Sequence, residues 1–157
     1  MGRMMRALEL KIPPPVVALI VAVAMWGISH AAARIEMSAP VRIGAALLIV
    51  IAGVCIAVSG VLAFRHAHTT TNPVKPEAAS SLVTSGIYRF TRNPMYLSLC
   101  LVLLAWALFL SSALAFLGPI VFVLYIGRFQ IAPEERALAR IFGAPFSDYR
   151  ARVRRWF

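Results

Sequence analysis

The chain has 157 residues, a length typical of one domain, and 61% of them are apolar while only 14% are charged. Soluble domains have roughly 45–50% apolar and about 25% charged residues, so the composition excludes a soluble globular domain, a disordered chain and a disulfide scaffold. A net charge of +10 would suit a nucleic-acid binder only on a polar body, which the mean hydropathy of +0.80 rules out. The composition therefore indicates an integral membrane protein.

Long uncharged runs predict where the chain crosses the membrane. Residues 12–33 and 43–64 are each uncharged over 22 residues, and residues 93–127 are uncharged over 35. One helix of 35 residues would be about 52 Å long, whereas the hydrocarbon core is about 30 Å thick, so this run must fold back at Ser111-Ser112. We expect an all-α membrane protein with four transmembrane helices, at 12–33, 43–64, 94–110 and 113–129. The third and fourth form a tight helical hairpin.

These spans divide the chain into an N-terminal segment with the first helix, residues 1–42, and a core, residues 43–157. The core contains a polar loop, residues 65–93, and a tail, residues 130–157. Fourteen of the 16 Lys and Arg residues lie before the first helix, in this loop or after the fourth helix. Only Arg34 and Arg42 lie on the other side. By the positive-inside rule, both termini and the loop are expected on the cytoplasmic side.

The N-terminus has an alternative interpretation. Basic residues 1–11, an apolar stretch at 16–28 and the small residues 31–33 also resemble a cleavable signal peptide. In the second helix, Ala46, Gly53 and Gly60 recur at a spacing of seven residues. Such a stripe of small residues predicts close packing against a neighbouring helix.

The tail reads as two short helices. Pro133 is a first-turn residue, Glu134 and Glu135 follow near the positive helix end, and Gly143 is typical of a helix stop. A second basic, amphipathic helix follows, which suits an anionic membrane surface. A carboxylate such as Glu134, just beyond a membrane span, is well placed to bind a cationic group.

The loop is most informative where it approaches the third helix. Gly86 permits a turn, and the aromatic residues Tyr88, Phe90 and Tyr96 alternate with the bases Arg89 and Arg92. A belt of aromatic and basic residues at the membrane interface would explain part of this pattern. The density of such residues beside a turn favours a binding site.

Residues 82–96, together with the tail pattern from Glu134-Glu135 through Phe142-Gly143, Phe146 and Tyr149 to Val153, resemble the isoprenylcysteine carboxyl methyltransferase family. That family belongs with the phospholipid methyltransferases, and the resemblance covers roughly residues 43–157. It implies a membrane methyltransferase that uses S-adenosylmethionine on the cytoplasmic side and releases S-adenosylhomocysteine. The absence of G-x-G-x-x-G from the sequence excludes a Rossmann-type methyltransferase.

By the resemblance, the cofactor pocket is formed by the loop, the start of the third helix and the tail. Glu134 would hold the amino group of the methionine moiety. The substrate would lie near Arg128 and Gln130. The other cofactor-binding residues implied are Ser81, Leu82, Val83, Tyr88, Asn93, Pro94, Met95 and Tyr96, with Ser80 at the edge of this set.

The sequence departs from the family pattern at two positions. Many members carry Arg-His-Pro where this chain has Arg92-Asn93-Pro94, and asparagine cannot titrate near neutral pH. An arginine that faces the substrate carboxylate in eukaryotic members is replaced by Gln130, which cannot form a bidentate ion pair. A prenylcysteine carboxylate is therefore not favoured as the acceptor, and the sequence identifies no general base and no metal site.

We expect methyl transfer to a lipid or another hydrophobic small molecule, with a carboxylate, thiol or amine as the accepting group. Two alternatives stay open: a non-catalytic membrane scaffold of the same fold, and a nicotinamide-dependent membrane reductase. The Ala- and Arg-rich composition suggests a bacterial inner membrane. The sequence does not identify the oligomeric state.

Overall fold

The computed structural model describes residues 9–31, 33–67 and 81–156. The part of the predicted loop at 68–80, including Ser80, lies outside the described residues. The described residues form helices and no strand, apart from an isolated bridge between Arg34 and Ser112. The helices, in chain order, are α2 (Pro14–Ser29), α3 (Ala39–His66), η2 (Gly86–Arg89), α4 (Pro94–Leu110), η3 (Ala113–Phe116), α5 (Leu117–Ile126), η4 (Gly127–Ile131), α6 (Ala132–Phe142) and α7 (Ala144–Arg152).

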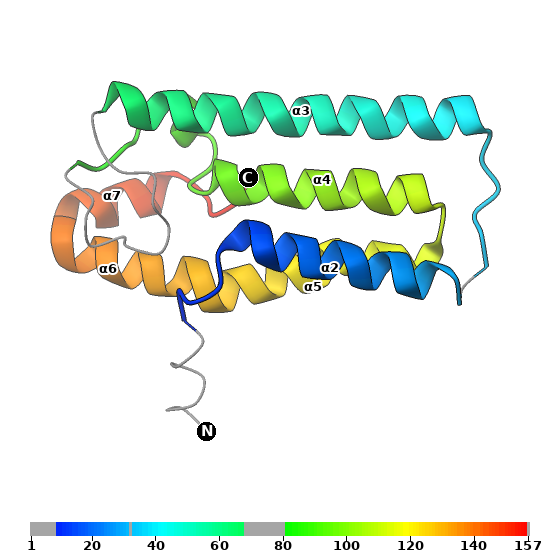
Figure 1. Cartoon of the computed structure of the whole chain (residues 1–157). Helices are drawn as coiled ribbons and strands as arrows, with labels where there is room; N and C mark the ends of the chain where they lie inside the picture. Colours follow the sequence, from blue (N-terminus) through cyan, green and yellow to red (C-terminus); the bar gives the residue numbers. More distant parts are fainter. Residues whose placement is uncertain (1–8, 32, 68–80, 157) are drawn as a thin grey trace.

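The long helices lie side by side in a bundle (Figure 1). Helix α4 packs against α3, α2 and α5, and α2 also packs against α5. Helices α6 and α7, η2 and the C-terminus gather at one end of this bundle, while the α2–α3 connection and the turn after α4 lie at the other end (Figure 1). The polar segments that the sequence singled out are therefore brought together at one end.

Close packing between α3 and α4 depends on the small residues of α3. Ala46, Gly53 and Gly60 are all buried. A Cβ atom at Gly53 would lie 3.3 Å from the carbonyl oxygen of Ser98, and one at Gly60 would lie 3.4 Å from Cγ of Pro94. The predicted helix-packing role of this stripe is confirmed.

Several predicted helix ends differ from the structure. The first helix is shorter than predicted, spanning 14–29, because the side chains of Ser29 and His30 bond to the carbonyl oxygen of Trp26 and end the helix there. The second helix starts at Ala39 rather than residue 43, since Pro40 occupies a first-turn position. The break at Ser111 is present, and this residue adopts a left-handed conformation with φ of 50°.

No break in the helix marks the start of the tail expected at residue 130. The helix runs from Ala113 to Phe142 over 30 residues, through the π-helical turn η4 and into α6. Only residues 113–127 of this helix are uncharged, because Arg128 follows. At about 1.5 Å per residue the whole helix is longer than a hydrocarbon core, so the polar segment α6 lies outside the membrane-spanning part.

Two helices, Ala39–His66 and Ala113–Phe142, are long and apolar enough to cross a membrane. Helices α2 and α4 are apolar but only 16 and 17 residues long. That all four helices span the membrane remains a prediction. Large apolar side chains face outward on several helices, including Leu19, Leu48 and Leu124, each more than 60% exposed. Such a surface suits lipid rather than water.

Candidate functional site

Tyr88 is held in a fixed position at the polar end of the bundle. The turn before it depends on Gly86, whose φ of 60° favours glycine. The ring of Tyr88 is buried and meets Phe64 of α3 edge to face at a centroid distance of 5.3 Å. Tyr149 of α7 donates a hydrogen bond to the carbonyl oxygen of Tyr88 at 2.8 Å. Burial raises the pKa of the Tyr88 hydroxyl, and nearby Tyr149 and Glu134 raise it further, so this phenol stays neutral.

The second feature is the pairing of Tyr96 with Glu134. Tyr96 lies in the first turn of α4, is 6% exposed and donates a hydrogen bond to the carboxylate of Glu134 in the first turn of α6. Burial raises the pKa of Glu134 to about 8, although the bond from Tyr96 lowers it and neighbouring Glu135 raises it slightly. In the described part of the chain, no lysine or arginine pairs with Glu134.

Glu135, the next residue, has the opposite environment. Its carboxylate accepts hydrogen bonds from Arg92 at 2.9 Å and from Arg155 at 2.6 and 3.2 Å. The side chains of Glu135 and Arg92 are only 13% and 11% exposed. Glu135 therefore links the loop, α6 and the C-terminal segment, while Glu134 faces the two tyrosines without a cation.

The C-terminal segment is also fixed to the start of α4. The backbone N–H of Arg92 donates to the carbonyl oxygen of Arg154 at 3.1 Å. The side-chain amide of Asn93 and the hydroxyl of Thr91 both donate to the carbonyl oxygen of Arg155, at 2.9 and 3.3 Å. Asn93 thus has a structural role in addition to the predicted cofactor role.

The structure brings most of the predicted cofactor-binding residues to one end. Leu82 and Val83 pack with Tyr88 in an apolar cluster that contains Phe146 and Tyr149. Pro94 and Met95 lie beside Gly60 of α3. The hydroxyl of Ser81 donates to the carbonyl oxygen of Ala67 at 3.1 Å. Tyr88, Tyr96 and Glu134 are close enough to influence one another electrostatically.

The two predicted substrate residues contact the segment before α2. Arg128 pairs with Glu9 at 3.0 Å, and the side-chain amide of Gln130 donates to the carbonyl oxygen of Ile12 at 2.7 Å. Arg136 pairs with the same Glu9 at 2.5 Å. Gln130 is fully buried, and its side-chain oxygen has no partner among the described residues. In this structure, Arg128 and Gln130 hold the N-terminal segment against η4.

Sequence reasoning did not predict the ion pairs of Glu135 with Arg92 and Arg155. It also missed the ion pairs that Glu9 forms with two arginines and the hydrogen bond from Tyr149 to the backbone of Tyr88. Arg92 and Glu135 are 43 positions apart, and Glu9 and Arg128 are 119 apart, so no local spacing reveals these contacts. One feature of the sequence could have indicated an ion pair at Glu9: it is the only acidic residue in the first 35 positions of a protein with a net charge of +10. In the described part of the chain, no group of three or more His, Cys, Asp or Glu side chains could hold a metal ion.

The arrangement is suited to binding an ammonium group. Desolvation of the partly buried Glu134 carboxylate raises its pKa, and no cation among the described residues offsets that cost. A positively charged ligand group would remove it, while Tyr96 orients the carboxylate and the apolar cluster around Tyr88 offers a surface for a ring.

Comparisons with known proteins identify the family of the chain. The family model for phospholipid methyltransferase matches residues 41–145. An uncharacterized protein of Haemophilus influenzae is 55% identical over 62 residues, which cover 40% of this chain and 98% of that protein. No solved structure matches the chain. The matched region begins near the start of α3 and includes Tyr88, Tyr96 and Glu134.

Proposed function

Because the chain belongs to the phospholipid methyltransferase family, we propose that it transfers a methyl group from S-adenosylmethionine to a lipid or another hydrophobic acceptor at the cytoplasmic membrane face. The observation that carries this proposal is the carboxylate of Glu134, which is partly buried, oriented by Tyr96 and without a cationic partner among the described residues. S-adenosylmethionine carries an ammonium group, which would supply the cationic partner that Glu134 lacks among the described residues.

The residues at the polar end fit the remaining parts of the cofactor. Glu134 would bind the ammonium group, and Leu82, Val83 and Tyr88 would provide an apolar and aromatic surface for the adenine ring. The cofactor supplies an activated methyl group on a sulfonium, so the protein need only align the acceptor and exclude water. The apolar cluster around Tyr88 would help to align the acceptor and to exclude water.

We propose that the acceptor approaches from the membrane. Tyr96 belongs to the apolar helix α4, and the outward faces of α2, α3 and α5 carry exposed apolar side chains. A molecule dissolved in the bilayer can therefore reach the polar end along the helices. Among the described residues, all Lys and Arg except Arg34 and Arg42 lie in segments at this end, which favours the cytoplasmic side.

The direct test is calorimetric binding of S-adenosylmethionine and S-adenosylhomocysteine to the detergent-purified protein. We expect micromolar binding to the full chain and a loss of at least tenfold in Glu134→Gln, because a hydrogen bond between charged groups contributes about 1.5–3 kcal/mol. Asp148→Asn is the control, since Asp148 is an exposed carboxylate on α7 that forms no ion pair among the described residues. Transfer of a radiolabelled methyl group into a membrane lipid extract then tests the reaction.

Two results would contradict the proposal. Folded protein that binds neither compound would point to a non-catalytic scaffold. Equal affinity in wild type and Glu134→Gln would place the cofactor elsewhere.

A further inference from the structure

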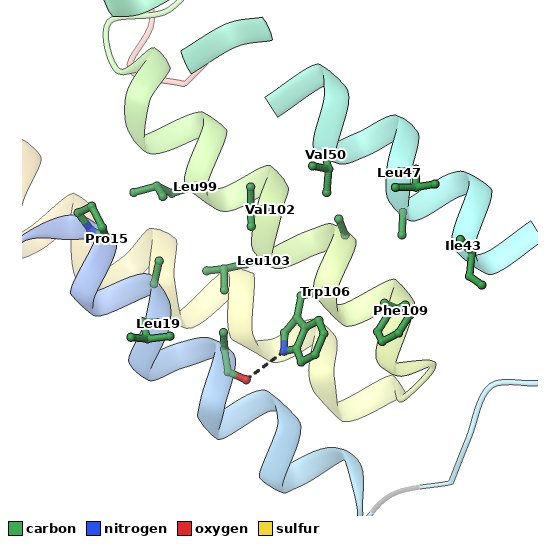
Figure 2. Close-up of a pocket in the computed structure, with 14 residues that line it drawn as sticks. Pro15, Leu19, Ile43, Leu47, Val50, Leu99, Val102, Leu103, Trp106 and Phe109 are labelled. Carbon is green, nitrogen blue, oxygen red and sulfur yellow. Dashed lines mark hydrogen bonds between the residues drawn. The ribbon is translucent and has the colours of Figure 1, made fainter. Parts of the chain in front are cut away.

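An apolar groove lies between α2 and α3, with α4 as its floor (Figure 2). Its volume is about 540 Å³, which is within the usual range of about 300–1,000 Å³ for ligand pockets. Leu19 of α2, Leu47 of α3 and Trp106 of α4 are among its lining residues, all of which are apolar. An apolar groove on a membrane bundle is accessible to lipid chains.

The groove exists because α3 packs mainly against α4, and α2 packs against α4 and α5, whereas α2 and α3 scarcely contact each other. Three of the lining residues, Ala22, Ala46 and Ala105, have small side chains that leave space in the groove. The indole N–H of Trp106 donates to the carbonyl oxygen of Ala22 at 3.0 Å, the dashed line in Figure 2, and so links the floor to one wall. This hydrogen bond holds the indole ring across the groove.

A positive charge lies at the end of the groove that is remote from Tyr96 and Glu134. Ile43 and Phe109 line that end, and the guanidinium of Arg42 lies over the Phe109 ring at 5.7 Å. Arg42 donates to the hydroxyl of Ser111 at 3.3 Å, while its Nε is buried and has no partner among the described residues. No carboxylate in the described part of the chain forms an ion pair with Arg42.

We propose that this groove binds one anionic phospholipid, with an acyl chain between α2 and α3 and the phosphate at Arg42. The charge of Arg42 matches a phosphate, because a guanidinium forms charge-assisted hydrogen bonds with phosphate oxygens. This lipid is a ligand of the fold rather than the methyl acceptor, because its head group lies at the end of the bundle opposite Glu134.

Native mass spectrometry of delipidated full-length protein tests the proposal. Phosphatidylglycerol and phosphatidylcholine with the same acyl chains are added in turn, and the bound fraction is measured. We expect one phosphatidylglycerol to bind at least tenfold more tightly than phosphatidylcholine. Arg42→Gln should abolish this preference, whereas Arg42→Lys should keep part of it because the charge remains.

Two matched controls separate the groove from general surface effects. Arg34→Gln removes another base from the same end without touching the groove, and should leave binding unchanged. Leu47→Trp fills the groove, while Leu48→Trp places the same ring on the adjacent exposed position, which does not line it. We expect Leu47→Trp to lose lipid binding and Leu48→Trp to retain it.

The proposal is wrong if phosphatidylcholine binds equally well, if Arg42→Gln keeps the preference, or if both tryptophan variants behave alike. None of these results depends on methyl transfer, so they are independent of the proposed enzymatic function.

Discussion

The hydroxyl of Tyr96, in the first turn of α4, donates a hydrogen bond to the carboxylate of Glu134, 38 residues later in the first turn of α6. This bond joins the start of one apolar helix to the polar continuation of another. It also favours the ionised form of a carboxylate whose burial favours the protonated form. Tyr96 therefore favours the charged form of Glu134 on which the proposed ammonium binding depends.

Replacement of Tyr96 by phenylalanine should weaken binding of S-adenosylmethionine by about tenfold, because the lost bond contributes about 1.5 kcal/mol to the ionised carboxylate. Tyr125→Phe is a matched control, since the Tyr125 hydroxyl has no partner among the described residues. Titration calorimetry of both variants measures the difference. Equal affinities in the two would show that Tyr96 has no part in holding Glu134.

Binding of the cofactor should release a proton below pH 8. Burial raises the pKa of Glu134 to about 8, so at about pH 6.5 the free protein carries a protonated acid, whereas an α-amino group is charged there. Pairing with the ammonium ionises Glu134, and affinity should therefore increase as pH rises toward 8.

Calorimetry at about pH 6.5 in two buffers with different ionisation enthalpies measures this release directly. We expect close to one proton for the wild type and none for Glu134→Gln. An affinity that is independent of pH between about 6 and 8, with no proton released, would contradict the ionisation of Glu134 on binding.

Removal of the Glu135 carboxylate should lower the stability of the protein. Glu135→Gln would leave Arg92, 11% exposed, without its ionic partner. Breaking a buried pair costs about 3 kcal/mol or more, and Arg155 would lose its contact with α6 as well. Thermal unfolding in detergent should show a lower midpoint for Glu135→Gln than for Asp148→Asn, and similar midpoints would mean that the pair contributes little.

The sequence was sufficient to predict most helices because the uncharged runs are long and bounded by charges. The turn at Ser111, the stop at Gly143 and the packing role of Gly53 all follow from local chemistry that the structure retains. The helix ends near residues 29 and 39 were not predicted, because they depend on side-chain bonds to the backbone and on proline position. The continuation of the helix through Gly127 was not predicted either. The charge of Arg128 indicates where the apolar span ends, but a helix can continue beyond that point.

In the candidate site, too, some residues could be identified from the sequence and some contacts could not. Tyr88, Tyr96 and Glu134 were identifiable because they lie in two segments that resemble motifs of a known family, and the structure brings them together. Their roles toward a cofactor stay a prediction. The hydrogen bond from Gln130 to the carbonyl oxygen of Ile12 was not identifiable from the sequence. The acceptor is a backbone atom 118 residues away, so the residue type at position 12 does not reveal it.

The contact between α2 and α5 should be sensitive to a single methyl group. A Cβ atom at Gly118 would overlap the thioether of Met25, which is 2% exposed and cannot move into solvent. Overpacking of this kind costs about 2 kcal/mol, so Gly118→Ala should lower the unfolding midpoint in detergent.

Gly27→Ala on α2 is the control, because no atom lies within 4 Å of the added methyl group. It should be neutral or stabilising, since alanine favours a helix by up to about 1 kcal/mol over glycine. In a double variant, Met25→Ala opens the space that the methyl group of Gly118→Ala needs, so the two changes should cost less together than the sum of the single effects. Strict additivity would show that Gly118 and Met25 do not meet.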